Sequence, residues 1–556
     1  MNDAEGEVSD MASHGAHADI RGDSPLGWWQ GHHPFAVLAV MLLVSLTSVP
    51  SLVGELRTPV GQQFTGAATY PEDVAQHETF AAEMATHLRY RNLLTPEPTQ
   101  RGWFFTPLEF TLGFAHRVTG ISYTALGIAI DLACAPALAF ALMALARRIG
   151  LDHPGAAALI ALLAGSFAPL VLGAARFGLT LGDPDIVRRM GGDATPNFAG
   201  VGLYLLLTTL VLIALPGAAS RDPARGFRRA GVALFALATI YPFFIPTLLL
   251  TVGLCALLWA RQWGWRPMLG GVGWLGLFSA PPIVYWAVLP RVDSEYARFA
   301  ASDRIPLLSP FTVLVSLGLG VGAIAGVPRL LRGNVYQQML ACFSVALVVA
   351  LYIPAHPWRS HLFYLSPVLV IAALAAWWPF LLRVRPVPRW LLVGCLLIAA
   401  TVSLPYYDRR NFDGLAHTGP PTYLTDDDVA AIRWIAGQPG DDVVLARTDV
   451  SPWVAARAQH RVVVGHYLWT HDYQRRRSEV EAIFAGSADP RPLLRAEHVA
   501  WILIDEERGT PPWARDVEPA ARFGQTVVLR ADPLLAHLEE QEQRTPPAGM
   551  SAHQLR

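Results

Sequence analysis

The sequence predicts an all-α polytopic membrane protein with about eleven transmembrane helices, followed by a small α/β domain. Two observations lead to this fold class. Of the 556 residues, 53% are hydrophobic and only 16% are charged, whereas about 25% of the residues in soluble proteins are charged. The charged residues are also unevenly spread, because they are scarce between Pro34 and Pro405 and plentiful from Tyr406 onward. We therefore expect a membrane domain over residues 34–405 and a water-soluble domain after it.

The N-terminal residues 1–33 are polar and rich in Gly, Ala, His and Asp, which is typical of a disordered tail. Trp28 and Trp29 precede the apolar run 34–53, which predicts a retained first membrane helix with aromatic residues at the interface. All four cysteines lie inside apolar runs, so no disulfide framework is expected. The net charge of −1 does not indicate nucleic-acid binding.

The remaining transmembrane helices are predicted from apolar runs, since a crossing needs about 20 mostly apolar residues. The candidate spans after the first are 121–146, 155–177, 198–215, 231–241, 243–260, 268–289, 310–327, 338–353, 361–382 and 390–404. We interpret the stretch 231–260 as two short helices that meet at Tyr241-Pro242. A single kinked helix there would reverse the side of every later segment.

Arginine residues predict the orientation. They gather in the short loops on one side of the predicted spans, while the loops on the other side hold fewer arginines, mixed with acidic residues. The arginine-rich side is cytoplasmic by the positive-inside rule. The N-terminus is then cytoplasmic, and the chain beyond residue 405 is extracytoplasmic.

The first external loop, 54–102, is too long to be a simple connection. Within it, apolar residues recur at roughly helical spacing, at Val74, Phe80, Met84 and Leu88. This predicts an amphipathic helix lying at the membrane surface. The following apolar stretch, 103–120, contains Pro107, Glu109 and His116, which favours an interfacial or re-entrant helix over a crossing.

The C-terminal part has a different pattern. Strand-like segments begin at Val443, Arg461, Trp501 and Gln525 and alternate with helix-like segments. This alternation predicts an extracytoplasmic α/β domain over 406–535. The last segment, 536–556, contains EEQEQR and is predicted to be disordered.

Several motifs occur in a particular order along the chain. They are Asp73 with His77, LLTPEP at 93–98, FFTPLEFTLG at 104–113, GDATPNF at 192–198, TIYPFF around Pro242, HPWRSHLF at 356–363 and GHYLWTHDYQRRR at 465–477. Together they resemble the GT-C fold glycosyltransferases, the membrane enzymes that use polyprenyl-phosphate sugars, and most of all their bacterial relatives. In many GT-C enzymes an acidic pair closely follows the first helix. Here only Glu55 is adjacent to that helix, and Asp73 lies well beyond it.

The resemblance implies a multi-pass protein of the bacterial plasma membrane that moves a sugar from a polyprenyl-phosphate donor to an extracytoplasmic glycan, lipid or protein, with inversion. Such a transfer needs a base for the acceptor hydroxyl and cationic groups or a metal for the departing phosphate. Asp73 is the predicted base, with a helix N-cap as its structural alternative. Asp193 is a second catalytic candidate, although a solvated loop would also carry such an acid.

The substrate-binding candidates are Arg359, His77, His356 and Glu97. Arg359 lies in the short external loop AHPWRSH, where a guanidinium would fork onto a phosphate or else extend toward lipid headgroups. His77 would join an acceptor or metal site. The sequence indicates no certain cofactor. It leaves open whether a divalent metal binds, and it does not identify ligands for one.

Two other functions compete with the transferase, namely a transporter or flippase of lipid-linked sugars and a non-catalytic membrane scaffold. Transporters gather ionisable residues near the middle of the bilayer. Here these residues lie mostly in external loops, and Asp131 is the acid inside a predicted span. This distribution favours the transferase. Convergence of Asp73 and Arg359 on one cavity would separate the transferase from the scaffold.

Overall fold

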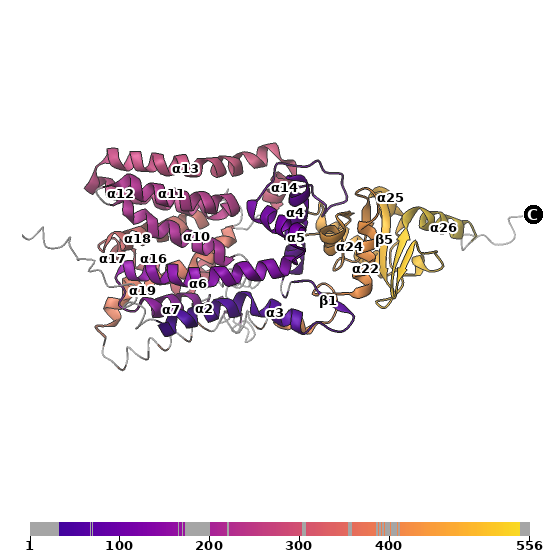
Figure 1. The fold of residues 1–556 in the computed structure, drawn as a ribbon, viewed down its shortest axis with the longest axis horizontal. Coiled ribbons are helices and arrows are strands. Elements are labelled where there is room, and N and C mark those ends of the chain that lie inside the picture. Colours follow the sequence, from indigo (N-terminus) through magenta and orange to yellow (C-terminus); the bar gives the residue numbers. More distant parts are fainter. Residues whose placement is uncertain are drawn as a thin grey trace, which may run out of the picture.

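The computed structural model describes residues 33–164, 166–168, 171–172, 201–219, 222–302, 307–353, 359–384 and 412–544, except Ala67 and Thr69, and isolated residues between 387 and 409. These residues form a long helical bundle and a C-terminal domain at one end of it (Figure 1). The predicted spans are therefore tested only in part, and the last of them, 390–404, lies almost entirely outside the described residues.

The bundle contains helices of very different length. It begins with α2 (His33–Thr47) and α3 (Val49–Leu56), and this pair bends by 50°. The others are α6 (Tyr123–Ile149), α7 (Pro154–Leu163), α10 (Val201–Ala214), α11 (Pro223–Ile240), α12 (Ile245–Trp263), α13 (Trp265–Val292), α15 (Pro310–Leu317), α16 (Val321–Ala325), α17 (Val327–Leu330), α18 (Val335–Leu351) and α19 (Ser366–Leu381).

By length and composition, five helices in the described part of the chain can cross a membrane, or six if the bent pair α2–α3 counts as one span. Three shorter apolar helices accompany them: Pro154–Leu163, Gly202–Ala218 and Val335–Leu351. A multi-pass membrane protein is thus supported. The described residues contain fewer candidate spans than the eleven that the sequence predicts.

The predicted break at Tyr241-Pro242 is confirmed. Tyr241 adopts an extended backbone with φ −149° and ψ 92°, as expected before proline, and the short helix η2 (Pro242–Phe244) follows it. Helix α11 begins earlier than predicted because Asp222 caps it by accepting from the Arg225 N–H. The arginine-rich segment after Asp222 therefore belongs to the first turns of α11.

Small residues allow the bundle helices to approach closely. A Cβ atom on Gly226 of α11 would lie 2.1 Å from the backbone nitrogen of Ala218. One on Gly231 would lie 3.1 Å from the Cα atom of Leu275 in α13. Close packing of small residues is a principal attraction between helices in a membrane, where the hydrophobic effect is weak.

The first external loop folds into β1 (Gln62–Phe64) and α4 (Pro71–His87), and α5 (Pro107–Thr119) follows. Both helices lie between the bundle and the C-terminal domain (Figure 1). The amphipathic helix predicted in this loop does form. Its apolar face, however, packs inside the protein: Phe80 contacts the rings of Tyr90, Phe104 and Trp469.

Helix α5 has 13 residues, which is too short for a crossing of about 20 and agrees with the interfacial prediction. Its C-terminal half carries exposed apolar side chains, with Phe114 53% and Val118 66% exposed. Leu88, which was predicted on the apolar face of α4, is also 63% exposed. Exposed apolar side chains therefore lie at the C-terminal ends of both α4 and α5.

The C-terminal domain contains a five-stranded sheet in the order β4-β3-β5-β7-β6. Its strands are β3 (Val443–Leu445), β4 (Arg461–Val462), β5 (Val499–Asp505), β6 (Ala521–Phe523) and β7 (Thr526–Arg530), and its helices are α22 (Asp426–Ala436), α23 (Ser451–Ala458), α24 (Tyr473–Phe484), α25 (Arg491–Ala496) and α26 (Ala531–Arg544). β3 pairs in parallel with β4 and β5, while β7 pairs antiparallel with β5 and β6. The strand-like segments identified in the sequence coincide with β3, β4, β5 and β7.

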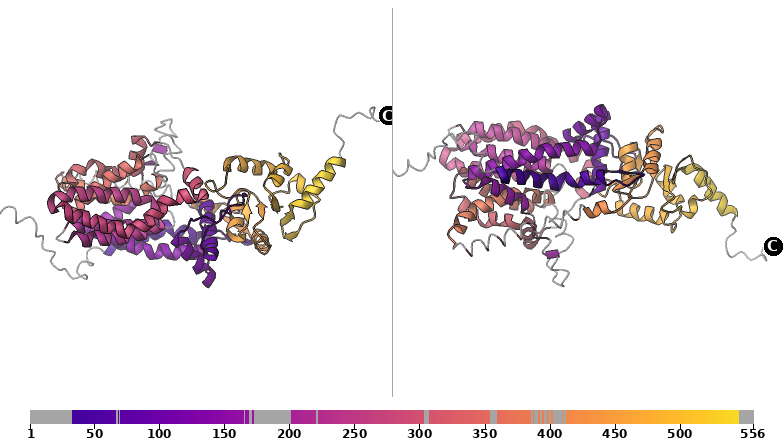
Figure 2. Two further views of the ribbon diagram at one scale, coloured as in Figure 1. Left: turned by 90° about the horizontal axis from the view of Figure 1, so that it is seen from above. Right: turned by 60° about the horizontal axis from the view of Figure 1, so that its bottom comes forward.

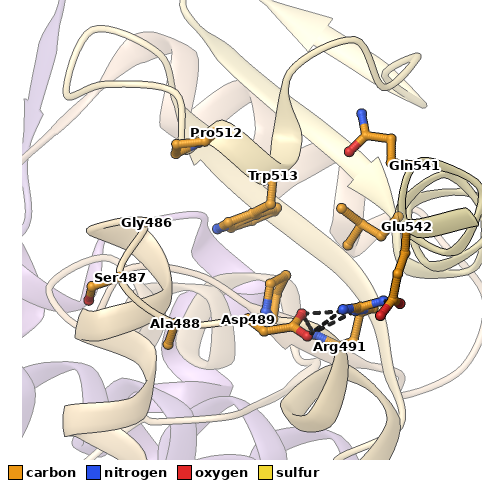
Figure 3. Close-up of a pocket in the computed structure, with 11 residues that line it drawn as sticks. Gly486, Ser487, Ala488, Asp489, Arg491, Pro512, Trp513, Gln541 and Glu542 are labelled. Carbon is orange, nitrogen blue, oxygen red and sulfur yellow. Dashed lines mark hydrogen bonds and ion pairs between the residues drawn. The ribbon is translucent and has the colours of Figure 1, made fainter. Parts of the chain in front are cut away.

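The prediction of disorder from residue 536 onward is wrong for residues 536–544, which continue α26. Leu534 is fully buried beside the sheet. Glu542 and Glu539 form ion pairs with Arg491 and Arg495 of α25. Figure 3 shows Arg491 beside Asp489 and Glu542 at the edge of a hollow of about 420 Å³. The charged residues that suggested disorder therefore hold α26 against α25 through these ion pairs.

The domain docks on the first external loop. β1 pairs antiparallel with β2 (Tyr423–Thr425), with Gln62 opposite Thr425. The Val462 N–H donates to the Leu93 carbonyl at 3.0 Å, and α23 packs on α4. This docking brings the motif at 465–477 against the N-terminus of α4.

Candidate functional site

Asp73 lies in the first turn of α4. The N-cap position of this helix is Tyr70, whose side chain makes no capping hydrogen bond. The capping alternative for Asp73 is therefore wrong. Its Oδ1 atom instead lies 2.7 Å from Nε2 of His466 in the C-terminal domain. The Asp73 side chain is 20% exposed and that of His466 is fully buried.

The hydrogen bonds of His466 determine which ring nitrogen carries the proton. The backbone N–H of Leu468 donates to Nδ1 at 3.2 Å. In the neutral ring the proton then lies on Nε2, which donates to Asp73. Thr470 fixes the loop, because its Oγ1 accepts from the backbone N–H of His466 and donates to the carbonyl of Leu94. His466 is thus held as a hydrogen-bond donor to the Asp73 carboxylate.

Glu72 points toward the same motif. Its carboxylate oxygens lie 3.5 Å from the hydroxyl of Tyr473 in α24. Burial raises the pKa of Glu72. The charge of His466 lowers this pKa and the charge of Asp73 raises it, and the overall shift is upward. Two adjacent carboxylates of α4 therefore face the C-terminal domain, and Glu72 holds a proton more readily than an exposed glutamate.

His77 follows one turn after Asp73. Its Nδ1 lies 3.1 Å from Oε1 of Glu109 in α5, and its side chain is 47% exposed while that of Glu109 is 10% exposed. Burial lowers the pKa of His77, but the hydrogen bond and charge of Glu109 and the charge of Asp73 outweigh burial and raise it overall. The other Glu109 oxygen, Oε2, is buried without a hydrogen-bond partner among the described residues.

An aromatic stack lies in the bundle below these helices. The rings of Tyr204 and Tyr241 are 3.9 Å apart and nearly parallel. The hydroxyl of Tyr241 lies 2.5 Å from Nδ1 of His361, in the short helix η4 (Arg359–Leu365). The bundle therefore holds a second polar and aromatic group, formed by Tyr204, Tyr241 and His361.

Glu97 is engaged by the C-terminal domain. Arg476 donates to both of its oxygens, at 2.6 and 2.9 Å, and Nδ1 of His471 lies 3.2 Å away. Burial alone would raise the pKa of Glu97, but the hydrogen bonds from His471, Arg476 and Thr95 hold it well below its usual range. In this structure Glu97 joins the external loop to the domain, and its role as a substrate ligand stays a prediction.

The other candidates are described incompletely. Asp193 and His356 lie outside the described residues, and Arg359 is described only by its backbone at the start of η4. The convergence of Asp73 and Arg359 is therefore not tested. Within the described part of the chain, no group of three or more His, Cys, Asp or Glu side chains is arranged to hold a metal ion.

Sequence reasoning missed two contacts of the site. The motif at 465–477 was noted only for the resemblance it carries, and its partner, Asp73, lies 393 residues away from His466. Glu109 was noted in an apolar stretch without a role. Its position could have been a signal, because an acidic side chain in an otherwise apolar short helix needs a polar partner.

No family model and no curated protein matches this chain. Among solved structures, it is similar to the oligosaccharyltransferase of Archaeoglobus fulgidus with a tethered acceptor peptide containing the NVT sequon. The identity is 12%, the match covers 86% of this chain and 70% of the other, and the TM-score is 0.47. It is also similar to ArnT from Cupriavidus metallidurans bound to undecaprenyl phosphate, with 13% identity, coverage of 91% and 98%, and a TM-score of 0.45.

Both are GT-C fold glycosyltransferases. They belong to the class that the sequence motifs resemble. The apo structure of ArnT is similar too, with a TM-score of 0.48 at 13% identity over 92% of this chain and 98% of the other. Because these TM-scores lie below 0.5, no residue of this chain takes its role from them.

Proposed function

We propose that this protein is a membrane glycosyltransferase that moves a sugar from a polyprenyl-phosphate donor to an extracytoplasmic acceptor. The observation that carries the proposal is the Asp73–His466 pair. A partly exposed carboxylate on a helix at the end of an apolar bundle is held by a buried histidine of a separate domain. Such a carboxylate meets the requirements for a general base, which needs access to substrate and a fixed orientation.

The proposed reaction is a single displacement. Asp73 accepts the proton of the acceptor hydroxyl while that oxygen bonds to the anomeric carbon of the sugar. The bond between this carbon and the phosphate oxygen breaks, and polyprenyl phosphate leaves with the electron pair. Because the acceptor attacks opposite the leaving group, the configuration at the anomeric carbon inverts.

His77 and Glu109 would bind the acceptor. The Glu109 carboxylate has one oxygen on His77 and a second, buried oxygen without a partner among the described residues. A buried carboxylate oxygen that lacks a donor is costly, and a sugar hydroxyl would supply that donor. His77 is half exposed, so it is open to a ligand on its other side.

The phosphate would lie at η4. This short helix begins with Arg359 and contains His361, which is hydrogen-bonded to Tyr241. A guanidinium forms two parallel hydrogen bonds to a phosphate, so Arg359 is the proposed phosphate ligand, with His356 beside it. Asp193 remains the proposed second carboxylate.

The test uses membranes that contain the wild-type chain or the Asp73→Asn variant and a panel of radiolabelled undecaprenyl-phosphate sugars. We expect label to leave the lipid for at least one donor, and we expect this transfer to fall by about 10²-fold in Asp73→Asn, because the amide cannot accept the proton. Asparagine still accepts the hydrogen bond from His466, so the fold should persist. Glu518→Gln, which changes an exposed acid of the C-terminal domain, is the matched control.

Retention of undecaprenyl phosphate by the purified chain gives an independent measurement. The Asp73→Asn variant should retain it as the wild type does, because Asp73 acts on the acceptor. Wild-type membranes that transfer no label from any donor, together with a chain that retains no undecaprenyl phosphate, would exclude the proposed function. Full transfer by Asp73→Asn would exclude Asp73 alone and leave Asp193 as the next carboxylate to change.

A further inference from the structure

Cationic side chains converge at the C-terminal end of α4. Arg117 of α5 donates from Nη1 to the Ala85 carbonyl at 3.3 Å. Burial lowers the pKa of His87, and the nearby charges of Arg101, Arg91 and Arg117 lower it further. The C-terminal end of a helix such as α4 also carries a partial negative charge, which favours cations.

Part of this positive charge is not neutralised by the protein. Arg91 forms an ion pair with Asp441 at 2.5 Å and faces Glu83 at 3.7 Å, and Arg101 faces Glu83 at 3.8 Å. Arg89 and Arg117, in contrast, have no carboxylate partner among the described residues. These two exposed guanidinium groups therefore carry an excess of positive charge at the surface.

Each of the two arginines has exposed apolar side chains beside it: Trp103 lies against Arg89, and Phe114 and Val118 are near Arg117 along α5. The guanidinium of Arg89 lies 4.2 Å from the centre of the Trp103 ring, and Trp103 is 54% exposed. On α5, Phe114 and Val118 lie one turn apart and are more than half exposed. A surface that mixes arginine, tryptophan and aliphatic side chains is typical of a membrane interface.

The surface lies at the depth where two spans end. Helix α5 leads through Gly120 directly into α6, an apolar helix of 27 residues. The backbone N–H of Trp103 donates to the carboxylate of Asp293 at 2.7 Å. Asp293 lies at the C-terminus of α13, an apolar helix of 28 residues. Figure 2 shows the indigo and purple helices of this region projecting sideways beyond the bundle.

We propose that this surface binds the headgroup of an anionic phospholipid in the leaflet next to the C-terminal domain. The headgroup site is formed by Arg89, Trp103, Phe114, Arg117 and Val118. The two arginines contact the phosphodiester, Trp103 lies at the level of the glycerol, and Phe114 and Val118 contact the acyl chains. The proposal requires that the bundle crosses a membrane, and it holds whether or not the chain transfers sugars.

The test is native mass spectrometry of the purified full chain titrated with phosphatidylglycerol or phosphatidylcholine. We expect the wild type to retain phosphatidylglycerol in preference. The double variant Arg89→Gln/Arg117→Gln should lose this preference by about fivefold for each arginine. Arg89→Lys/Arg117→Lys keeps the charge and should retain most of the binding. Arg530→Gln is the matched control, because Arg530 is an exposed arginine 5.5 Å from the Trp501 ring in the C-terminal domain.

One further double variant and one competitor separate the sources of phosphate. Phe114→Ala/Val118→Ala should weaken phosphatidylglycerol binding, because acyl-chain contacts are lost, while glycerol 1-phosphate should not compete. Efficient competition by glycerol 1-phosphate would overturn the lipid proposal in favour of a water-soluble phosphate. Equal phosphatidylglycerol retention by the wild type and the glutamine pair would overturn it as well. If the double variant Arg89→Gln/Arg117→Gln proves unstable, the wild type alone still tests the proposal. Equal retention of phosphatidylglycerol and phosphatidylcholine by the wild type would overturn it.

Discussion

At the scale of single residues, the Asp73–His466 hydrogen bond explains why both residues occupy unfavourable surroundings. His466 is fully buried, and a buried histidine is costly unless both ring nitrogens are satisfied. Here Leu468 and Asp73 satisfy them. In the proposed mechanism His466 is a positioning residue, and the proposed base is complete only when the C-terminal domain is docked.

A split between kcat and KM distinguishes positioning from simple packing. In His466→Leu the Asp73 carboxylate loses the donor that fixes its orientation, so kcat for sugar transfer should fall by about tenfold or more while KM for the lipid donor stays near its wild-type value. His466→Gln restores a donor and should recover part of kcat. Equal kcat values for folded His466→Leu and wild type would mean that His466 only supports packing.

Sequence patterns could identify Asp73 and His77 as neighbours, because residues four apart share one face of a helix. They could not predict the partners of either residue. His466 reaches Asp73 through a domain docked by the β1–β2 pairing, and the position of α5 brings Glu109 to His77. The N-cap interpretation failed because Tyr70, with φ 54°, precedes Pro71 and takes that position.

At the scale of secondary-structure elements, apolar runs and proline breaks were sufficient to find most of the bundle helices. They did not predict that the apolar face of α4 would be covered by Trp469, or that α26 would extend through EEQEQR. Both results depend on contacts between distant segments. A charged helix is stable when oppositely charged groups lie opposite it, as Arg491 and Arg495 do for α26.

The packing of α4 against α23 contains a buried acid. Glu78 of α4 lies 3.7 Å from Arg457 of α23, and burial raises its pKa to about 7 despite that arginine. A raised carboxyl pKa means that the folded state binds the proton more tightly than the unfolded state. The stabilising contribution is thus fully present below pH 4.5 and is lost as pH rises through 7.

We therefore expect the thermal stability of the docked domain to fall between pH 4.5 and 7, by up to about 3 kcal/mol for this group. Glu78→Gln stays neutral at every pH, so its melting temperature should be nearly flat over this range and higher than wild type above pH 7. Thermal unfolding followed by tryptophan fluorescence at several pH values measures this difference. Parallel curves for the two proteins would show that Glu78 does not ionise in this window.

At the scale of the whole molecule, the bundle has two chemically different ends. The end next to the C-terminal domain carries α4 and α5 (Figure 1), and with them the Asp73–His466 pair. At the other end the Arg148 guanidinium donates to the Ile213 carbonyl, and the Arg329 guanidinium lies 3.9 Å from the centre of the Trp377 ring. The arginine-rich turns predicted to be cytoplasmic thus lie away from the C-terminal domain, as the positive-inside rule requires if that domain is extracytoplasmic.

Cysteine labelling tests this orientation in intact cells. In a variant without native cysteines, single cysteines at Ser294 and Ser487, both exposed near or within the C-terminal domain, should react with a membrane-impermeant maleimide. A cysteine at Gln262, exposed at the far end of α12, should react only after the cells are permeabilised. Because Gln262 ends α12 and Ser294 follows α13, this pair also tests whether α13 crosses the membrane. Labelling at Gln262 with protection at Ser487 would put the proposed site in the cytoplasm and remove an extracytoplasmic acceptor, whereas labelling at both Gln262 and Ser294 would show that α13 does not cross.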